Sequence, residues 1–164
     1  MSNCVVEYAM DGIRFEDSDT RFNNYALGNV TVQRCSGNGV YVTGGQYAAV
    51  TLNNFQLWTN STGLQSDGGP VTFNGGLVTG NTGTGISANS TLTATGTTVS
   101  QNAGWGISAN PAILSGCVVS QNGSGVSCNN GANALTSCVV TGNRGDGVAT
   151  NLSLIHISEP TRPY

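Results

Sequence analysis

A short sequence unit recurs along the chain about every 21 residues, and this repeat limits the possible folds more than any other feature. It is clearest in "GLVTGNTGTGISA", "TTVSQNAGWGISA", "CVVSQNGSGVSC" and "CVVTGNRGDGVAT", where an apolar residue stands three positions before an Asn. A Gly followed by Ile or Val comes soon after that Asn. The repeated asparagines are Asn60, Asn81, Asn102, Asn122 and Asn143. Two earlier units carry Ala9 and Cys35 at the Asn position.

Apolar residues align at fixed distances from the Asn position in every unit. Three positions before it stand Val6, Val32, Leu57, Val78, Val99, Val119 and Val140. Eight positions before it stand Met1, Leu27, Leu52, Phe73, Ala94, Leu114 and Leu135. Just after the anchor glycines stand Ile13, Val40, Leu64, Ile86, Ile107, Val126 and Val148. The intervening positions are mostly polar, and alternation with period two predicts strands that bury one face.

Three short strands per unit, without helical periodicity, predict one coil of a solenoid. The fold class is therefore all-β, a parallel β-helix of about seven coils of about 21 residues each. Asn side chains that point inward at a corner are expected to form a ladder from coil to coil and to bond to turn backbone. The anchor glycines are expected to adopt a backbone conformation that is closed to other residues.

The Asn-x3-Gly-[Ile/Val] unit resembles the repeats of right-handed parallel β-helix proteins, the pectin-lyase-like superfamily. The resemblance covers residues 1–151 and implies a right-handed solenoid at the cell surface or outside the cell. Family members include polysaccharide lyases and hydrolases, phage tailspikes, and bacterial surface and adhesin regions. The resemblance specifies the fold more strongly than the function.

The charges in this segment do not form the catalytic sets that such enzymes use. The polygalacturonase-type Asn-Thr-Asp, Asp-Asp and Gly-His-Gly motifs are absent. Lysine is absent too, since the five basic residues are all Arg, and the net charge of −3 argues against nucleic-acid binding. No apolar run approaches the roughly 20 residues of a membrane-spanning helix. We therefore predict no catalytic residue, no cofactor, no nucleic-acid partner and no membrane span.

Two groups of residues are candidates for ligand contact. The acidic residues Glu16, Asp17 and Asp19 lie in "RFEDSDTR", within the longest interval between anchor glycines, and this interval predicts an outward loop. Their carboxylates suit a calcium ion or a sugar, although a solvated loop explains them equally simply. The aromatic residues Tyr41, Trp58 and Trp105 are expected to face outward, where they would stack on sugar rings or cover a neighbouring loop.

The five cysteines lack the paired spacing of a zinc site. Cys4, Cys117 and Cys138 share one inward column, five positions before the Asn position, and Cys128 is inward on another strand. Buried cysteines behave as small apolar residues, and this is the expected role here. A disulfide between Cys117 and Cys138 would need the strands to approach more closely than their usual spacing.

The final segment follows a different pattern from the repeats. "LSLIHISEPTR", from Leu152 to Arg162, resembles the translation of a transposase mosaic-end adapter from short-read library preparation. We therefore treat residues 152–164 as a non-native tail and exclude His156, Glu159 and Arg162 from any site. The solenoid is expected to be truncated at both ends, and its exposed coil ends are expected to promote self-association.

Two hypotheses for function remain open from the sequence. The first is a segment of a secreted or surface bacterial β-helix protein that serves as a structural stalk or a carbohydrate-contacting surface, with polysaccharide as its partner. The alternative is a segment of a polysaccharide lyase or glycoside hydrolase whose catalytic residues lie outside these repeats.

Overall fold

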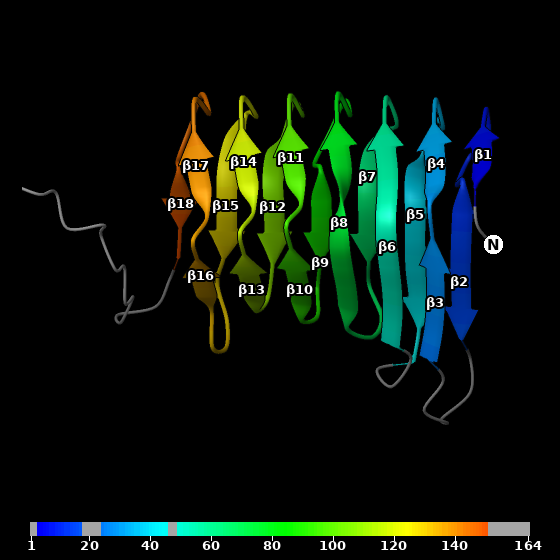
Figure 1. Cartoon of the computed structure of the whole chain (residues 1–164), viewed down its shortest axis with the longest axis horizontal. Coiled ribbons are helices and arrows are strands. Elements are labelled where there is room, and N and C mark those ends of the chain that lie inside the picture. The colour runs from blue at the N-terminus through cyan, green and yellow to red at the C-terminus, as the bar shows by residue number, and fades with distance from the viewer. Residues whose placement is uncertain (1–2, 18–23, 46–48, 151–164) are drawn as a thin grey trace, which may run out of the picture.

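The computed structural model describes residues 3–17, 24–45 and 49–150, and these form a β-solenoid with three faces (Figure 1). All pairings between the described strands are parallel. The strands stack side by side along the long axis, from β1 at one end to β17 and β18 at the other.

Each face is one stack of strands, and we name the faces A, B and C. Face A consists of β2 (Ile13–Asp17), β5 (Asn38–Gly44), β7 (Thr62–Ser66), β9 (Ile86–Ala88), β12 (Trp105–Ala109), β15 (Ser124–Cys128) and β18 (Val148–Ala149). Face B consists of β3 (Asn24–Gly28), the first halves of β6 (Ala49–Trp58) and β8 (Val71–Thr79), β10 (Leu92–Thr95), β13 (Ala112–Ser115) and β16 (Ala134–Thr136). Face C consists of β1 (Cys4–Glu7), β4 (Val30–Gln33), the second halves of β6 and β8, β11 (Thr98–Ser100), β14 (Val118–Ser120) and β17 (Val139–Thr141).

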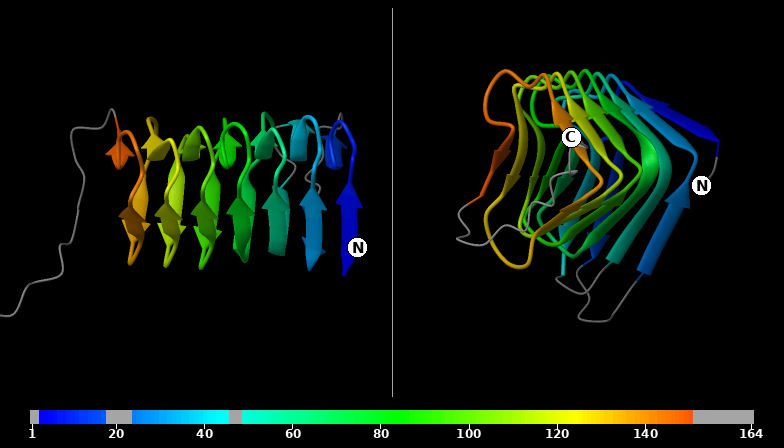
Figure 2. Two further views of the ribbon diagram at one scale, coloured as in Figure 1. Left: turned by 90° about the horizontal axis from the view of Figure 1, so that it is seen from above. Right: turned by 60° about the vertical axis from the view of Figure 1, so that its left-hand side comes forward.

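The chain passes through the faces in the order C, A, B, and Figure 2 shows how the coils stack behind one another. From β1 to β17 the described chain returns six times to face C, which gives six full turns. The predicted count of seven coils is one higher because the first and last sequence units each contribute only part of a coil.

The strand register confirms the apolar columns. On face C, Val32 pairs with Leu57 and Leu57 with Val78. On face A, Leu64 pairs with Ile86 and Ile86 with Ile107. Residues of one column therefore lie directly above one another.

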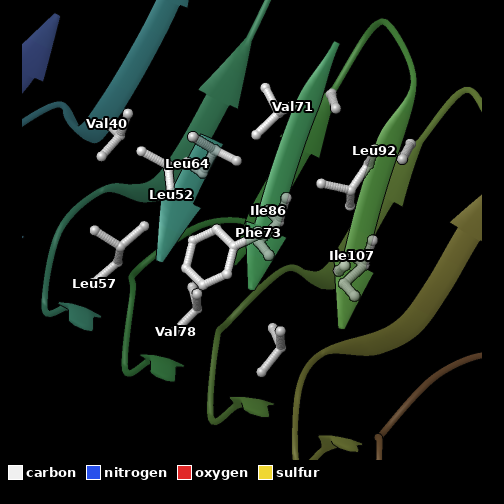
Figure 3. Packing of buried hydrophobic residues seen from close by; sticks show 14 of the residues in the cluster. Val40, Leu52, Leu57, Leu64, Val71, Phe73, Val78, Ile86, Leu92 and Ile107 are labelled. Atoms are coloured by element: carbon white, nitrogen blue, oxygen red, sulfur yellow. The ribbon is translucent and has the colours of Figure 1, made fainter. Parts of the chain in front are cut away.

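The core is a continuous apolar column along the axis of the solenoid (Figure 3). Leu52, Leu64 and Phe73 are all fully buried, and each comes from a different strand. The rings of Phe55 and Phe73 meet edge to face, with their centroids 6.5 Å apart. Each large side chain packs against neighbours from the coils above and below, and this interdigitation joins the coils into one core.

The predicted asparagine ladder is present at the corner between faces C and A. Asn81 Oδ1 accepts a hydrogen bond from the backbone N–H of Asn60 at 2.9 Å, and Asn102 Oδ1 accepts from Asn81 at 3.1 Å. The Nδ2 group of Asn102 donates to Asn122 Oδ1 at 2.9 Å and to the Val78 carbonyl at 3.2 Å. Asn143 continues the pattern, since its Oδ1 accepts from the N–H of Asn122.

The ladder also reaches a unit that lacks Asn, since the N–H of Cys35 donates to Asn60 Oδ1 at 3.0 Å. Each buried ladder Asn therefore has both its oxygen and its amide group bonded, as burial of a polar group requires.

The anchor glycines have a different role from the predicted one. Left-handed backbone is found instead at the residue just before the ladder position, and most of these residues are not Gly: Tyr8, Arg34, Thr59, Gly80, Gln101, Gln121 and Gly142. At an anchor such as Gly85 the constraint is space. A Cβ there would lie 2.6 Å from the Gly106 carbonyl oxygen and 2.8 Å from Asn102 Nδ2. From Gly12 to Gly125 the anchors are glycine because the coils approach too closely for a side chain.

None of the described residues forms a helix long and apolar enough to cross a membrane.

Candidate functional site

A polar cluster lies on the outer side of face A, near the β2 end of the solenoid. Arg14 on β2, Tyr41 on β5 and Gln65 on β7 are in register in one outward column. Asp67 and Asn89 follow β7 and β9, and both stand four positions after an anchor glycine. We call the surface formed by Arg14, Tyr41, Gln65, Asp67 and Asn89 the Asp67 surface.

Asp67 is the centre of this surface. Its carboxylate accepts hydrogen bonds from Tyr41 Oη at 2.9 Å, from Gln65 Nε2 at 2.5 Å and from Asn89 Nδ2 at 2.8 Å. Its backbone N–H donates to the Val42 carbonyl at 2.9 Å. Residues from three successive coils therefore hold one exposed carboxylate in a fixed position.

The single cation of this surface, Arg14, is already engaged. Its guanidinium carbon lies 4.9 Å from the centre of the Tyr41 ring. Its Nη1 lies 3.4 Å from Asp11 Oδ2, and its Nε forms an ion pair with Glu16. Asp11 also accepts hydrogen bonds from the backbone and side-chain amides of Asn38, both at 3.0 Å, so it links the turn before β2 to the start of β5. Two carboxylates contact the one guanidinium and Asp67 adds a third on the same surface, so the local charge is negative.

A shallow depression adjoins Asp67 on the side away from Arg14. It has a volume of about 340 Å³ and is lined by Asp67, Gly68, Pro70, Asn89, Ser90, Thr91 and Asn110. Ser90 Oγ donates to the Gly69 carbonyl at 2.6 Å, so one lining hydroxyl is held by backbone. The lining offers amide and hydroxyl groups together with a proline ring, a combination that suits a polar, uncharged ligand.

Only part of the predicted ligand-contact set belongs to this surface. Tyr41 belongs to it and stands between the buried residues Val40 and Val42, and Glu16 borders it through Arg14. The predicted loop is wrong for its first residues, because Arg14 to Asp17 continue strand β2 in register with β5. Phe15 packs against the core from this strand, and that alternation explains why the segment is extended. Asp19 lies outside the described residues.

The two tryptophans do not join the Asp67 surface. Trp105 begins β12 on face A and pairs with Ser124, in a different column from Tyr41. Trp58 ends β6 on face C and is 37% exposed. The aromatic residues therefore do not form one continuous sugar-binding strip.

Trp58 lies beside a second polar group on face C. It pairs with Gln33, whose Nε2 donates to Glu7 Oε2 at 2.6 Å, and Arg34 Nη1 lies 3.2 Å from the same oxygen. The Arg34 guanidinium also lies 5.7 Å from the centre of the Tyr8 ring. Gln33 Oε1 is buried and has no hydrogen-bond partner among the described residues. This group is therefore an ion pair next to one unpaired buried acceptor.

Sequence reasoning missed Gln65, Asp67 and Asn89, although one signal was present. Glu16, Thr43, Asp67, Asn89, Asn110 and Asn129 all stand four positions after an anchor glycine. This outward column contains Asp67 and Asn89 of the Asp67 surface, whereas Gln65 belongs to the column of Arg14 and Tyr41, two positions after the anchor glycines.

Residues 3–17, 24–45 and 49–150 contain no site at which several side chains would hold a metal ion. Within these ranges no group of three or more His, Cys, Asp or Glu side chains is placed to hold a metal ion. The free cysteines are Cys4, Cys35, Cys117, Cys128 and Cys138.

Comparisons with known proteins agree with this architecture. A family model described as "Right handed beta helix region" matches residues 1–159. No curated protein and no solved structure matches the chain. The stacked three-faced coils, the asparagine ladder and this match lead to one conclusion: the chain belongs to the right-handed β-helix family.

Proposed function

We propose that the chain is part of a secreted or surface-exposed β-helix protein and that its Asp67 surface contacts a neutral polysaccharide. The observation that carries this proposal is the Asp67 carboxylate, which is exposed and held by side chains from three coils. Such a carboxylate costs little further ordering when a ligand binds, because its position is already determined.

The hydrogen-bonding capacity of Asp67 supports contact with sugar hydroxyls. An ionised carboxylate has about four acceptor sites, and Asp67 uses three of them within the protein. The remaining site suits a hydroxyl donor. The carbonyl oxygens of Gln65 and Asn89 are further acceptors, since both residues use their amide nitrogens to bond to Asp67.

The charge of the surface supports a neutral polymer over an acidic one. Asp11 and Glu16 already form ion pairs with Arg14. Asp67 adds a third carboxylate, and none of its hydrogen bonds comes from a cation. A uronate chain would bring more negative charge to this surface and would be repelled at low ionic strength. A neutral glycan avoids this repulsion.

Affinity electrophoresis of the chain against immobilised polysaccharides tests the proposal. We expect retardation by a neutral polymer such as xylan or β-glucan and weaker retardation by polygalacturonate, measured with and without calcium. Asp67→Ala should weaken binding about five- to tenfold, the worth of about one hydrogen bond. Ser108→Ala, on the same face but outside the Asp67 surface, is the matched control.

Two outcomes would contradict this proposal. Stronger binding to polygalacturonate than to any neutral polymer would contradict the charge argument. Cleavage of a bound polymer, seen as new reducing ends, would favour the enzymatic alternative over a binding surface.

A further inference from the structure

Cys117 and Cys138 occupy equivalent positions on adjacent coils, one residue before β14 and β17. Val118 pairs with Val139, and the N–H of Val139 donates to the Cys117 carbonyl at 2.8 Å. Cys117 is fully buried, while Cys138 is partly exposed. The register therefore places one thiol directly beside the other, with access from the Cys138 side.

The two thiols also share one side-chain orientation. Cys117 Sγ lies 3.6 Å from the Ser115 carbonyl oxygen, and Cys138 Sγ lies 3.4 Å from the Thr136 carbonyl oxygen, two residues earlier in each case. Thr97, in the same column one coil before, places its Oγ1 3.3 Å from the Thr95 carbonyl oxygen. Because the pose repeats from coil to coil, the separation of the two sulfur atoms follows the strand spacing of about 4.8 Å.

This separation favours one kind of chemistry over another. A disulfide needs a sulfur–sulfur distance of about 2.05 Å and a Cβ separation of about 3.8 Å, which would draw the two coils together against their backbone ladder. A metal ion held linearly between two thiolates needs a sulfur–sulfur distance of about twice a metal–thiolate bond; with the zinc–thiolate bond of about 2.3 Å as a guide, this is about 4.6 Å. Bridging by a metal ion therefore fits the stacked thiols with little movement.

We propose that Cys117 and Cys138 form a two-thiolate site for a soft metal cation of the copper(I) class. Copper(I) prefers thiolate ligands and accepts linear two-coordination. Binding replaces the two thiol protons with two metal–sulfur bonds and releases both protons to solvent, with no change in oxidation state.

The surroundings of the pair select for such a cation. Leu114 and Val119 are fully buried beside the thiol column, and Ala94 contributes a carbonyl oxygen 3.4 Å from Cys117 Sγ. Hard cations such as calcium or magnesium require several oxygen ligands or waters, which this apolar column does not supply. The site therefore discriminates between metal ions by the softness of its ligands.

Copper(I) titration under anaerobic conditions, with a competing chelator to buffer the free ion, tests the proposal on the whole chain. We expect one tightly bound ion per chain in the native protein and loss of that ion in Cys138→Ser, which changes a partly exposed side chain. Cys128→Ser, a buried cysteine in another column, is the matched control and should retain the ion. X-ray absorption at the copper edge should show two sulfur neighbours at one distance.

Equal copper(I) stoichiometry in the native chain and in Cys138→Ser would overturn the proposal, as would loss of the ion in Cys128→Ser alone. Far-UV circular dichroism of each variant establishes that the solenoid is retained. Cys117→Ser should also lose the ion. If this buried substitution prevents folding, the comparison of Cys138→Ser with Cys128→Ser still decides the question.

Discussion

Replacing Asn102 with Leu should destabilise the solenoid strongly, because Asn102 lies in the middle of the ladder. Its Oδ1 accepts from both the backbone N–H and the Nδ2 group of Asn81, at 3.1 and 2.8 Å. Leucine has a similar side-chain volume but cannot accept hydrogen bonds, so these two donors lose that partner in a buried corner. The Nδ2 group keeps its bond to the Leu57 carbonyl, so the backbone N–H is the fully orphaned donor, and the loss is about 1–3 kcal/mol of unfolding free energy.

Urea unfolding followed by far-UV circular dichroism measures this loss, provided that the slope m is unchanged between variants. Asn143→Leu should cost clearly less, because Asn143 is only partly buried. Asn130→Leu, at an exposed position, is the control and should stay within about 0.5 kcal/mol of the native chain. A loss below about 1 kcal/mol for Asn102→Leu, or a loss as large for Asn143→Leu, would refute the view that ladder bonds hold the corner.

Three further predictions follow from the same structure. Gly85→Ala should cost about 1–3 kcal/mol, because its Cβ would lie 2.6 Å from a backbone oxygen. Gly147→Ala should be nearly neutral in the same urea assay, because none of the described residues lies within 4 Å of a Cβ at that position. Equal costs for the two variants would contradict the close-approach argument. Burial raises the pKa of the Cys128 thiol above its ordinary value of 9.0, so the thiol ionises more readily in the unfolded chain than in the folded one. The neutral buried thiol therefore contributes to stability below pH 9.0, and this contribution is lost as the pH rises through the higher pKa of the folded state. Urea midpoints between neutral and alkaline pH should therefore fall less for Cys128→Ala than for the native chain, and parallel curves would count against this assignment. The exposed side chains of Val5 and Met10 near edge strand β1 should promote self-association, and light scattering should show smaller particles when both are changed to Lys; a monomeric native chain would rule this out.

The inward columns could be predicted from the sequence because burial acts directly on residue type. Val78 or Leu114 must be apolar wherever the chain folds back on itself, and the period of the repeat then gives the register. The asparagine ladder was predictable for a related reason, since a buried amide is tolerated only where identical neighbours satisfy it.

Other features depend on geometry that residue type does not reveal. The left-handed corner residues include Gln101 and Gln121, whose side chains give no sign of an unusual backbone. The repeated anchor glycines indicated a constraint at that position. The sequence did not show whether the constraint was an unusual backbone conformation or the close approach of the neighbouring coil. The Asp67 surface was missed because outward positions tolerate many residue types. Asp67 and Asn89 share a polar column with Glu16 and Thr43, and the sequence does not show which members of that column meet.

The orientation of the backbone hydrogen bonds has a mechanical consequence. Neighbouring strands are neighbours along the long axis, so the ladder bonds that join one coil to the next are directed along it (Figure 1). A pull between the two ends acts in the same direction as these bonds and opens them strand by strand, beginning at a terminal coil. Each coil of about 21 residues that peels away would lengthen the chain by about 70 Å. Under load, the solenoid would lengthen one coil at a time while the remaining coils keep their shape.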